Sequence, residues 1–320
     1  MNVCVVGSTM VDLVSRVPRL PAIGETLVGR SFALGFGGKG GNQAIAAARL
    51  GADVTLVTRV GADRFGDSAL ANYRAAGIGL RYVLQDERHV TGVATIFVDD
   101  EAQNCIVIVP GANDALTPAD VGTAAAAIAG AQVVVCQLEV PASAALEAFR
   151  IARGAGATTI FNPAPATAVP DEIWGLTKIA VPNETEAELL TGIPVIDDAQ
   201  AESAARVLLG RGAGAVILTL GKRGSLVVTS DDVERIAPVV VDAVDSTGAG
   251  DAFVGTLAVC VSAGMPLIDA ARRANVVAAL SVTRAGTQTS FAAESEARAF
   301  LAGFGFALFP DGIPAAIDSD

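Results

Sequence analysis

Cysteine and histidine are scarce in this sequence. Among 320 residues there are only four cysteines and one histidine. His89 has no neighbours typical of a catalytic triad or a metal site, so we assign no role to it. The four cysteines are widely spaced and lie mostly in apolar surroundings, which favours reduced core thiols over a disulfide framework or a zinc site. We therefore expect an intracellular, cytoplasmic protein whose free thiols are Cys4, Cys105, Cys136 and Cys260.

Long hydrophobic runs are also lacking, although 52% of the residues are apolar. The longest uncharged stretches are Val121–Leu138 and Ala252–Ile268. Both are interrupted by glycine, glutamine or proline, and neither reaches the roughly 20 apolar residues of a spanning helix. The N-terminus runs directly into "VCVVG" without the basic flank or cleavage site of a signal peptide. We expect a soluble protein that does not act in a membrane.

Positive charge is in deficit. The chain has 22 lysines and arginines against 34 aspartates and glutamates, a formal net charge of −12. This balance disfavours nucleic acid and anionic membranes as partners. An anionic ligand would have to be held locally, by backbone amides, a metal ion or single basic side chains.

Repeats and low-complexity linkers are absent, and apolar runs alternate instead with helix-like segments. Helical patterns such as 41–50, 67–76 and 185–190 fall between many of these runs. The alternation predicts an α/β fold, in which a mainly parallel central sheet is covered by helices on both faces. The runs that predict buried strands are Val3–Gly7, Val54–Gly61, Gln132–Glu139, Thr158–Pro165, Lys178–Asn183 and Ala215–Gly221.

Two β-rich regions interrupt this alternation, at about 13–36 and 91–109. The second contains "DDEAQN", which predicts a hairpin turn. We expect the two regions to form a small β-sheet attached to the main domain, as a candidate lid. The expected organisation is one α/β domain over 1–308, followed by a loosely attached C-terminal tail over 309–320.

The glycine-rich segment "GFGGKGG" (Gly35–Gly41) contains the string of a dinucleotide-binding motif without its context. The first strand lies far upstream, and the next strand ends at Arg59, where an acidic residue would be needed for ribose. The Gly-Lys pairs at 38–39 and 221–222 lack the following Ser or Thr of a P-loop. Nicotinamide and P-loop chemistry are therefore disfavoured.

A second glycine-rich stretch, "DSTGAGDAFVG" (Asp245–Gly255), precedes a long uncharged segment. Gly248, Ala249 and Gly250 have little or no side chain, so another group can approach their backbone closely. The first amides of a helix lack internal partners and attract anions. Asp251 is then either an acid favoured by the helix dipole or a catalytic carboxylate beside an anion-binding turn. The stretch alone leaves both interpretations open.

Five segments together resemble the ribokinase-like (PfkB-type) family of carbohydrate kinases. The resemblance runs from about Val3 to about Leu301, nearly the whole chain. It implies the ribokinase-like fold and an ATP-dependent sugar kinase. The segments, in the order of the family, are "GGKGGNQAIAAARLGA" (37–52), "NPAPA" (162–166), "PNETEAELLTG" (182–192), "DSTGAGDAFVGTLA" (245–258) and "SVTRAGTQTS" (281–290).

The resemblance implies that catalysis takes place at Asp251. This residue corresponds to the base that accepts the proton of the sugar's primary hydroxyl. The amides of residues 247–250 correspond to an anion hole for the transferred phosphoryl group. The implied catalytic residues are Asp251, Gly248, Ala249 and Gly250.

The resemblance also implies ATP and Mg²⁺. Asn183 and Glu186 correspond to a pair that orders the waters around magnesium and the phosphates, although the same residues fit a capping box. Asn275 corresponds to a position on the helix that borders adenine, and alone it would be an ordinary polar residue of a helix. The implied nucleotide-binding positions are Asn183, Glu186, Thr219, Gly221, Gly224 and Asn275.

A monovalent cation, K⁺, is implied beside the anion hole. In the family two loops enclose it with carbonyls and one carboxylate, which suit a large, weakly hydrated ion. Asp245 could instead cap its turn without any ion. The corresponding positions are Asp245, Thr247, Ser281, Arg284, Gly286 and Ser290.

The implied sugar site combines residue types that bind hydroxyls. Met10 departs from the family, in which an asparagine usually stands two residues before Asp12. A thioether is a weak acceptor, so 2-deoxyribose should be accepted as well as or better than ribose, unless Met10 is a core residue. Lys39 and Asn42 also fit the first turn of a helix. The implied sugar-binding residues are Met10, Asp12, Gly38, Lys39, Asn42, Glu139 and Asp251.

The implied reaction is transfer of the γ-phosphate of ATP to the 5-hydroxyl of a pentose, ribose or 2-deoxyribose. The alternatives are a nucleoside or hexose kinase of the same fold, and a sugar-binding sensor that has lost catalysis. The intact Gly-Ala-Gly-Asp turn speaks against a sensor. Lids of the family clasp one another, so the two β-rich regions imply a homodimer.

Overall fold

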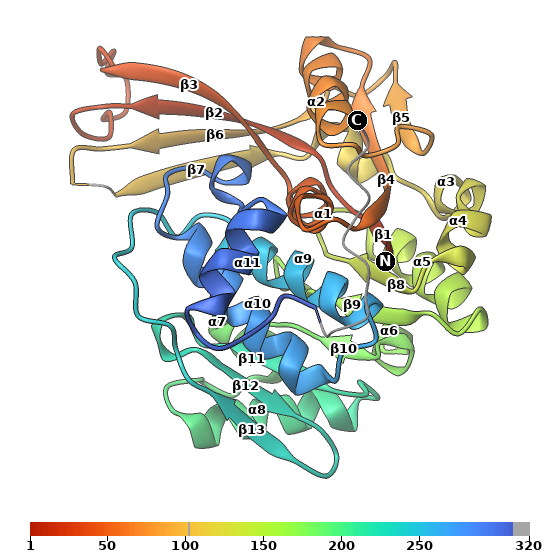
Figure 1. Ribbon diagram of the computed structural model, residues 1–320. Coiled ribbons are helices and arrows are strands. Elements are labelled where there is room, and N and C mark those ends of the chain that lie inside the picture. The colour runs from red at the N-terminus through yellow and green to blue at the C-terminus, as the bar shows by residue number, and fades with distance from the viewer. Residues whose placement is uncertain (102, 310–320) are drawn as a thin grey trace.

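A nine-stranded sheet forms the centre of the molecule. The computed structural model describes residues 1–101 and 103–309, and Figure 1 shows their arrangement. The strands from β11 to β5 pair in parallel, and β12 and β13 add an antiparallel edge. In sheet order they are β13 (Val233–Ile236), β12 (Ser225–Val228), β11 (Val216–Thr219), β10 (Ile179–Ala180), β9 (Thr158–Phe161), β8 (Val133–Cys136), β1 (Asn2–Val6), β4 (Asp53–Gly61) and β5 (Val83–Asp86).

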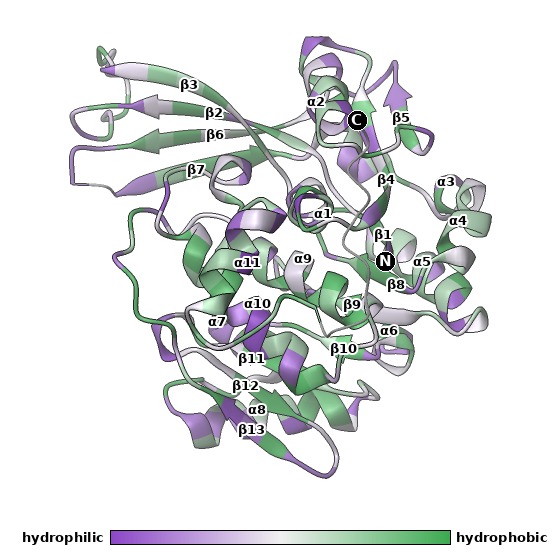
Figure 2. Cartoon of the chain, in the orientation of Figure 1, coloured by the Kyte–Doolittle hydropathy of each residue, from purple (hydrophilic) through white to green (hydrophobic). Residues whose placement is uncertain are grey.

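The central strands are apolar because both of their faces are buried. In β1, Val3 and Val5 enter one hydrophobic core, and Cys4 and Val6 enter the other. Successive side chains of a strand point to opposite faces, so a strand covered on both sides reads as a continuous apolar run. Figure 2 shows this hydrophobic centre in green.

Helices cover the two faces of the sheet. One core is closed by α1 (Lys39–Arg49), α2 (Arg64–Ala75), α9 (Ala249–Ser262), α10 (Leu267–Ser281) and α11 (Glu294–Ala302). The other is closed by α3 (Pro118–Thr123), α4 (Ala125–Gly130), α5 (Ala142–Gly154), α6 (Glu172–Leu176), α7 (Glu184–Thr191) and α8 (Asp198–Gly210). Short 3₁₀ turns complete the elements: η1 (Gly111–Ala115), η2 (Gly221–Arg223) and η3 (Gln288–Ser290).

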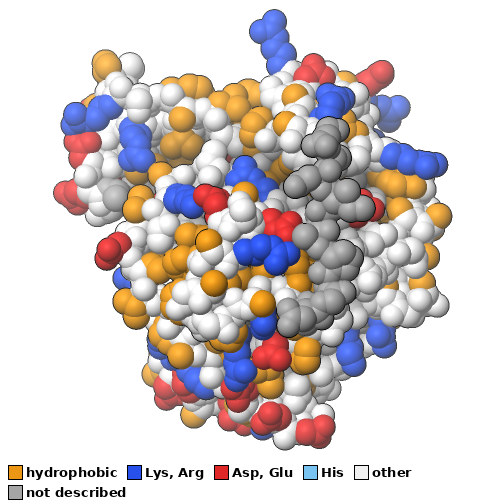
Figure 3. All heavy atoms as spheres, viewed as in Figure 1, with side chains coloured by type: hydrophobic (Ala, Val, Ile, Leu, Met, Phe, Trp, Pro, Cys, Tyr) orange, Lys and Arg blue, Asp and Glu red, His pale blue; other side chains and the backbone are white. Residues whose placement is uncertain are grey.

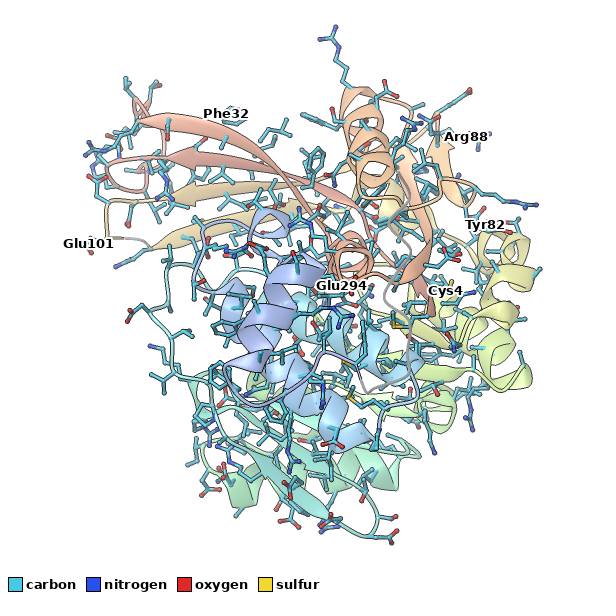
Figure 4. The ribbon with its side chains drawn as sticks, viewed as in Figure 1. Cys4, Phe32, Tyr82, Arg88, Glu101 and Glu294 are labelled. Carbon is cyan, nitrogen blue, oxygen red and sulfur yellow. The ribbon has the colours of Figure 1, made fainter. Side chains whose placement is uncertain are left out.

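A smaller, four-stranded sheet projects from this body at the upper left of Figure 1. Strand β2 pairs antiparallel with β3 and parallel with β6, and β6 pairs antiparallel with β7. Glu101 lies in the β6–β7 turn, at the far end of the sheet (Figure 4). The strands are β3 (Ser31–Gly37), β2 (Met10–Arg16), β6 (Gly92–Val98) and β7 (Asn104–Val109).

The mainly parallel sheet, its two helical layers and the small sheet confirm the predicted fold class. The small sheet begins earlier than predicted, because β2 starts at Met10 and therefore includes Asp12. The predicted strands do not include β5, β12 or β13; β5 and β13 are partly buried edge strands with charged residues, so they lack a continuous apolar run. The domain boundary at 308 stays a prediction, and nearly all of the predicted tail, 310–320, lies outside the described residues.

The described ranges contain no helix long and apolar enough to cross a membrane. All four cysteines are free, and Cys4, Cys136 and Cys260 are buried while Cys105 is exposed on β7. Burial raises the pKa of Cys4 and of Cys260 to about 12. These buried thiols therefore stay protonated and act as packing groups.

Candidate active site

The Gly-Ala-Gly-Asp stretch forms the start of α9. Gly248 has a φ of 80°, and a Cβ there would lie 2.7 Å from Cγ2 of Thr287, so glycine is required. The helix begins at Ala249, which places the buried Asp251 in its first turn. A Cβ at Gly250 would meet no protein atom within 4 Å, so the space beside this residue is open.

The amides of this turn are only partly free. Thr247 donates its N–H to Oδ1 of Asp245, and Ala249 donates to the carbonyl of Ser246. Among the described residues, the amides of Gly248 and Gly250 have no acceptor. Two of the four amides expected to form an anion hole are therefore engaged within the turn, and two remain available to a ligand.

The carboxylate of Asp251 is held by two amide side chains of α1. Asn42 Nδ2 donates to Oδ2 at 2.8 Å, and Gln43 Nε2 donates to Oδ1 at 2.9 Å. The two helices approach closely because Gly255 faces Ala46, where a Cβ on the glycine would lie 2.6 Å from the alanine Cβ. Small residues at the crossing thus bring Asn42 and Gln43 to Asp251.

Glycines of the "GGKGG" segment let α1 begin against the loop after β1. Gly38 has a φ of 82°, and a Cβ at Gly40 would lie 2.5 Å from the backbone of Gly7 and Ser8. The Glu139 carboxylate then accepts hydrogen bonds from the N–H of Lys39 at 2.7 Å and from the Ser8 hydroxyl at 2.6 Å. A carboxylate at a helix N-terminus is electrostatically favourable. The helix-start interpretation of Lys39 and Asn42 is confirmed.

Asp12 lies on β2 opposite glycines of β3. A Cβ at Gly37 would overlap the Asp12 carboxylate, so this glycine leaves room for the charged group. Burial, together with the negative charges of Glu139 and Asp251, raises the pKa of Asp12 to about 6. Asp12 therefore faces the same space as these two carboxylates.

Lys39 supplies the positive charge of this space. Burial lowers the pKa of Lys39, but the charges of Asp251, Glu139 and Glu186 outweigh burial and leave that pKa above its ordinary value. The ammonium group therefore stays charged near neutral pH. It can balance the surrounding carboxylates and attract an anionic ligand.

A capping box starts α7, as one of the two interpretations of "NETE" predicts. Asn183 Oδ1 accepts from the Glu186 N–H at 2.8 Å, and Glu186 Oε2 accepts from the Asn183 N–H at 2.9 Å. Burial raises the pKa of Glu186, although the Asn183 amide and Lys39 oppose this shift. The Asn183 backbone also bridges to Thr219 at the end of β11.

A cavity of about 170 Å³ joins the start of α9 to the start of α7. It brings together predicted catalytic, sugar-binding and nucleotide-binding positions. Gly221, Gly224 and Asn275 are not part of its lining. Asn275 instead donates to the carbonyl of Ala237 at 2.9 Å. The lining residues are Lys39, Asn162, Val181, Asn183, Glu186, Thr219, Ser246, Gly248, Ala249, Gly250, Asp251 and Val254.

The two loops expected to enclose a cation meet at Asp245. Its Oδ1 accepts from the Thr247 N–H at 2.9 Å, and its Oδ2 accepts from the Gly286 N–H at 2.9 Å. Burial raises the pKa of Asp245, but these donors and the Thr247 hydroxyl outweigh burial and hold that pKa below its ordinary value. Asp245 therefore caps its turn, and its carboxylate keeps further lone pairs.

The remaining predicted cation positions use their side chains elsewhere. Ser281 and Ser290 donate their hydroxyls to backbone carbonyls of Ala278 and Thr287. Arg284 forms an ion pair with Glu296 at 2.9 Å. The Arg284 side chain is therefore excluded as a ligand, whereas the serine hydroxyl oxygens and the backbone carbonyls keep lone pairs for a cation.

Comparison with known proteins places this chain in a family. A model described as pfkB family carbohydrate kinase matches residues 1–294. This chain belongs to the pfkB family. The matched range contains all the residues of the 170 Å³ cavity and both loops at Asp245.

Alignments with relatives in the pfkB family cover nearly the whole length of this chain and of each relative. The ribokinase of Mus musculus is 46% identical over 294 residues, covering 90% of this chain and 91% of the relative. The deoxyribokinase of Salmonella typhi is 40% identical over 292 residues, covering 91% of this chain and 95% of the relative. The structure of Arabidopsis thaliana ribokinase complexed with ribose and ATP has a TM-score of 0.87 at 29% identity, covering 94% and 98%.

Sequence reasoning misses several buried polar residues of this pfkB-family site. Gln43 contacts Asp251 directly, and Asn162 Oδ1 accepts from Gln43 Nε2 at 3.0 Å. Gln288 donates to Asn42, and Gln137 donates to Gln43. One signal was available for Gln43, because it is a polar residue in the otherwise alanine-rich run "NQAIAAA".

Proposed function

We propose that this chain is an ATP-dependent kinase that phosphorylates the 5-hydroxyl of a pentose. The main support is the environment of Asp251. This buried carboxylate lies at the start of a helix, accepts hydrogen bonds from two side-chain amides and is bordered by free backbone amides. Such an arrangement combines a proton acceptor with a site for the charge of a phosphoryl group.

Each step of the transfer can be assigned to a named group. The sugar hydroxyl oxygen attacks the γ-phosphorus, the bond to the bridging oxygen breaks, and ADP leaves. Asp251 accepts the hydroxyl proton, and the amides of Gly248 and Gly250 stabilise the charge on the transferred group. Ala249 contributes by being small, since its own N–H is engaged. Lys39 lines the same cavity and adds a positive charge.

The proposed sugar site lies between β2 and α1. Asp12 and Glu139 would accept hydrogen bonds from sugar hydroxyls, and Asn42 retains one unused N–H for a third. The glycines at 37 and 38 keep side chains out of this space. Carboxylates and amides around an open volume are typical of polyol recognition.

The proposed nucleotide site lies on the other side of the cavity. Asn183 and Glu186 would order the waters of Mg²⁺, which would supply charge neutralisation for the phosphates. Thr219 lies beside Asn183, and the β11–β12 turn with Gly221 and Gly224 follows it. Asn275 would mark the adenine border, although its side chain now binds the backbone of Ala237.

We further propose that K⁺ binds between the two loops that meet at Asp245. Oxygen ligands would come from Asp245 and from backbone carbonyls of Thr247, Ser281, Arg284, Gly286 and Ser290. The ion would supply positive charge and rigidity beside the free amides of α9. Rates measured in potassium and in sodium chloride at equal ionic strength test this proposal.

Met10 supports 2-deoxyribose as a substrate. Side chains alternate along a strand, so Met10 shares the face of β2 that carries Asp12. Met10 is only 3% exposed, yet it belongs to neither of the two hydrophobic cores formed by the described residues. A buried thioether beside the sugar site favours a CH₂ group over a hydroxyl, which would lose its hydrogen-bond partner.

A homodimer through the small sheet is the proposed assembly. The pairing register of the four strands places Phe32, Leu34 and Val107 on the face of the small sheet opposite Asp12. These side chains are 65%, 46% and 56% exposed, respectively. Hydrophobic side chains gather along the sheet in Figure 3, and Phe32 projects away from the main body in Figure 4. Because both β3 and β7 are open edges, a second copy of the same sheet can cover this apolar face.

ADP release measured with a panel of pentoses, hexoses and nucleosides tests the proposed function. A pentose kinase gives its highest kcat/KM with ribose or 2-deoxyribose. Preference for a hexose or a nucleoside assigns the chain to the alternative kinases, and sugar binding without ADP release assigns it to the sensors. The free cysteines and the need for ATP support a cytoplasmic location.

A further inference from the structure

Two separate chains of side-chain amides converge on the carboxylate of Asp251. At Oδ2, Asn42 Nδ2 donates at 2.8 Å, while Asn42 Oδ1 accepts from Gln288 Nε2 at 3.0 Å. At Oδ1, Gln43 Nε2 donates at 2.9 Å, while Gln43 Oε1 accepts from Gln137 Nε2. Every link donates toward the carboxylate.

The direction of both chains follows from the chemistry of the groups. An ionised carboxylate only accepts hydrogen bonds, so Asn42 and Gln43 must turn their NH₂ groups toward Asp251. Their oxygens then face Gln288 and Gln137. All five residues are buried, and Gln43 has no exposed surface, so water cannot replace a missing amide without cost.

The chain that ends at Oδ2 continues beyond Asn42 to Gln288 and to helix α2. Gln288 lies in η3, and its Oε1 accepts from Asn72 Nδ2 of α2 at 2.8 Å. The amide two residues before it, at Gly286, donates to Asp245. Gln288 therefore connects α2, α1 and the loop at Asp245 with the carboxylate of Asp251.

We propose that Gln43 and Gln288 are positioning residues for the base Asp251, an inference that rests on the proposed function. Gln43 acts on Oδ1 directly, and Gln288 acts on Oδ2 by fixing the orientation of Asn42. Each carboxylate oxygen has about two lone-pair sites, so the bonds leave one site on each oxygen free. The chains aim a free site at the acceptor hydroxyl and stabilise the ionised carboxylate that must receive the proton.

The test replaces each glutamine by methionine, which is unbranched, similar in length and unable to donate. We expect Gln43→Met to lower kcat about tenfold or more, as for loss of a hydrogen bond to a charged group, and Gln288→Met, which acts through the neutral Asn42, to lower it about threefold to tenfold. The KM for ATP should change less than about twofold, because neither residue lines the nucleotide side. The acid limb of the pH profile of kcat/KM should move to higher pH, since fewer donors hold the ionised carboxylate.

Thr177→Val is the matched control. Thr177 is also buried, and its hydroxyl donates to the carbonyl of Ile173 at 2.7 Å, away from Asp251. This variant should lower Tm while leaving the acid limb in place. Gln43→Glu is a second variant of nearly unchanged size, and its added carboxylate should move the acid limb further than Gln43→Met does.

The outcomes separate this inference from the proposed function. Glutamine variants that lower Tm but keep the wild-type kcat and acid limb overturn the positioning role. If Gln43→Met does not fold, Gln288→Met and Gln43→Glu decide the result in the same way. A folded wild-type chain that phosphorylates no sugar overturns the proposed function, and the inference with it.

Discussion

At the scale of single residues, the site concentrates negative charge in a partly closed space. Asp12, Glu139 and Asp251 lie near one another, and Lys39 is the cation among them. Charged groups placed together for binding and catalysis reduce folding stability. Two side chains of this space, Asp12 and Met10, give separate tests of that arrangement.

Replacing Asp12 by asparagine should stabilise the protein at pH 7. Burial and the neighbouring carboxylates raise the pKa of Asp12 from 3.8 to about 6, so its ionised form is disfavoured in the folded state. The cost is full above pH 6 and disappears as the pH falls toward the unfolded value. We expect Asp12→Asn to gain of the order of 1 to 3 kcal/mol at pH 7 and little at pH 4.

Urea unfolding at the two pH values measures this difference, with Asp231→Asn as a control at an exposed aspartate. If Asp12→Asn gains the same stability at pH 4 as at pH 7, or loses stability at pH 7, the predicted cost of ionising Asp12 in the folded state is wrong. The same variant should bind the sugar more weakly, because one acceptor oxygen is replaced by a donor.

Replacing Met10 by asparagine should shift the sugar preference toward ribose. The wild type should use 2-deoxyribose at least as well as ribose, and Met10→Asn should change the ratio of the two kcat/KM values by about tenfold. Initial rates with both sugars give this ratio. Ribose favoured tenfold by the wild type, with no further gain in the variant, would show that Met10 does not select the sugar.

At the scale of elements, the start of α1 is the part that assembles the site. It brings Lys39, Asn42 and Gln43 to the start of α9, and it depends on glycines that touch the loop after β1. Close backbone contacts at these glycines therefore help to set its position.

Gly40→Ala should displace this helix. The added Cβ would lie 2.5 Å from the backbone of Gly7 and Ser8, so the start of α1 must move. We expect a loss of about 1 to 3 kcal/mol of stability and a fall in kcat, since Asn42 and Gln43 move with the helix.

Gly122→Ala in α3 is the matched control, because its Cβ would meet no atom within 4 Å. It should be neutral or stabilise the protein by up to about 1 kcal/mol. Chemical denaturation and single-substrate kinetics on both variants give the comparison. Equal stability of the two alanine variants would refute the close approach at Gly40.

Local features of the site could be predicted from the sequence, and distant ones could not. The capping box at Asn183 and the helix start at Gly248 depend on neighbouring residues, so short motifs identify them. The contact between Gln43 and Asp251 joins residues 208 positions apart, and that between Asn42 and Gln288 joins residues 246 apart. Only the packing of α1, α9 and η3 creates these contacts.

The strands show the same limit. Runs buried on both faces, such as β1, predict a parallel sheet, whereas the edge strands β5 and β13 are only partly buried and carry charged residues. The motif predicts free amides at Thr247 and Ala249, whereas both donate hydrogen bonds within the turn. Competition between a local acceptor and a ligand depends on backbone geometry that the residue types do not specify.

At the scale of the whole molecule, the small sheet gives the protein two different surfaces. One face carries Asp12 and Met10 toward the site, and the opposite face carries Phe32, Leu34 and Val107 toward solvent. Because residues of both faces alternate along the same strands, covering the outer face would also stiffen the face that carries the proposed sugar site.

The double variant Leu34→Glu and Val107→Glu should convert the proposed homodimer into a monomer. Two charges on the outer face of each sheet would have to be buried, which is unfavourable without partners. Light scattering measures the mass of wild type and variant. Leu189→Glu, at an exposed leucine of α7, is the control and should remain dimeric. A monomeric wild type, or a variant that stays dimeric, rules out this interface.

The most direct test of the account compares ADP release by the wild type and by Asp251→Asn with ribose and 2-deoxyribose. Asparagine keeps the size of the side chain and removes the proton acceptor, while the amides of Gly248 and Gly250 stay in place. We predict a wild type that forms the 5-phosphate of at least one of these sugars. In the variant, kcat should fall by about 100-fold or more with little change in the KM for ATP. Near wild-type turnover in Asp251→Asn would contradict the assignment of the base, and absence of pentose phosphorylation by the wild type would contradict the proposed function.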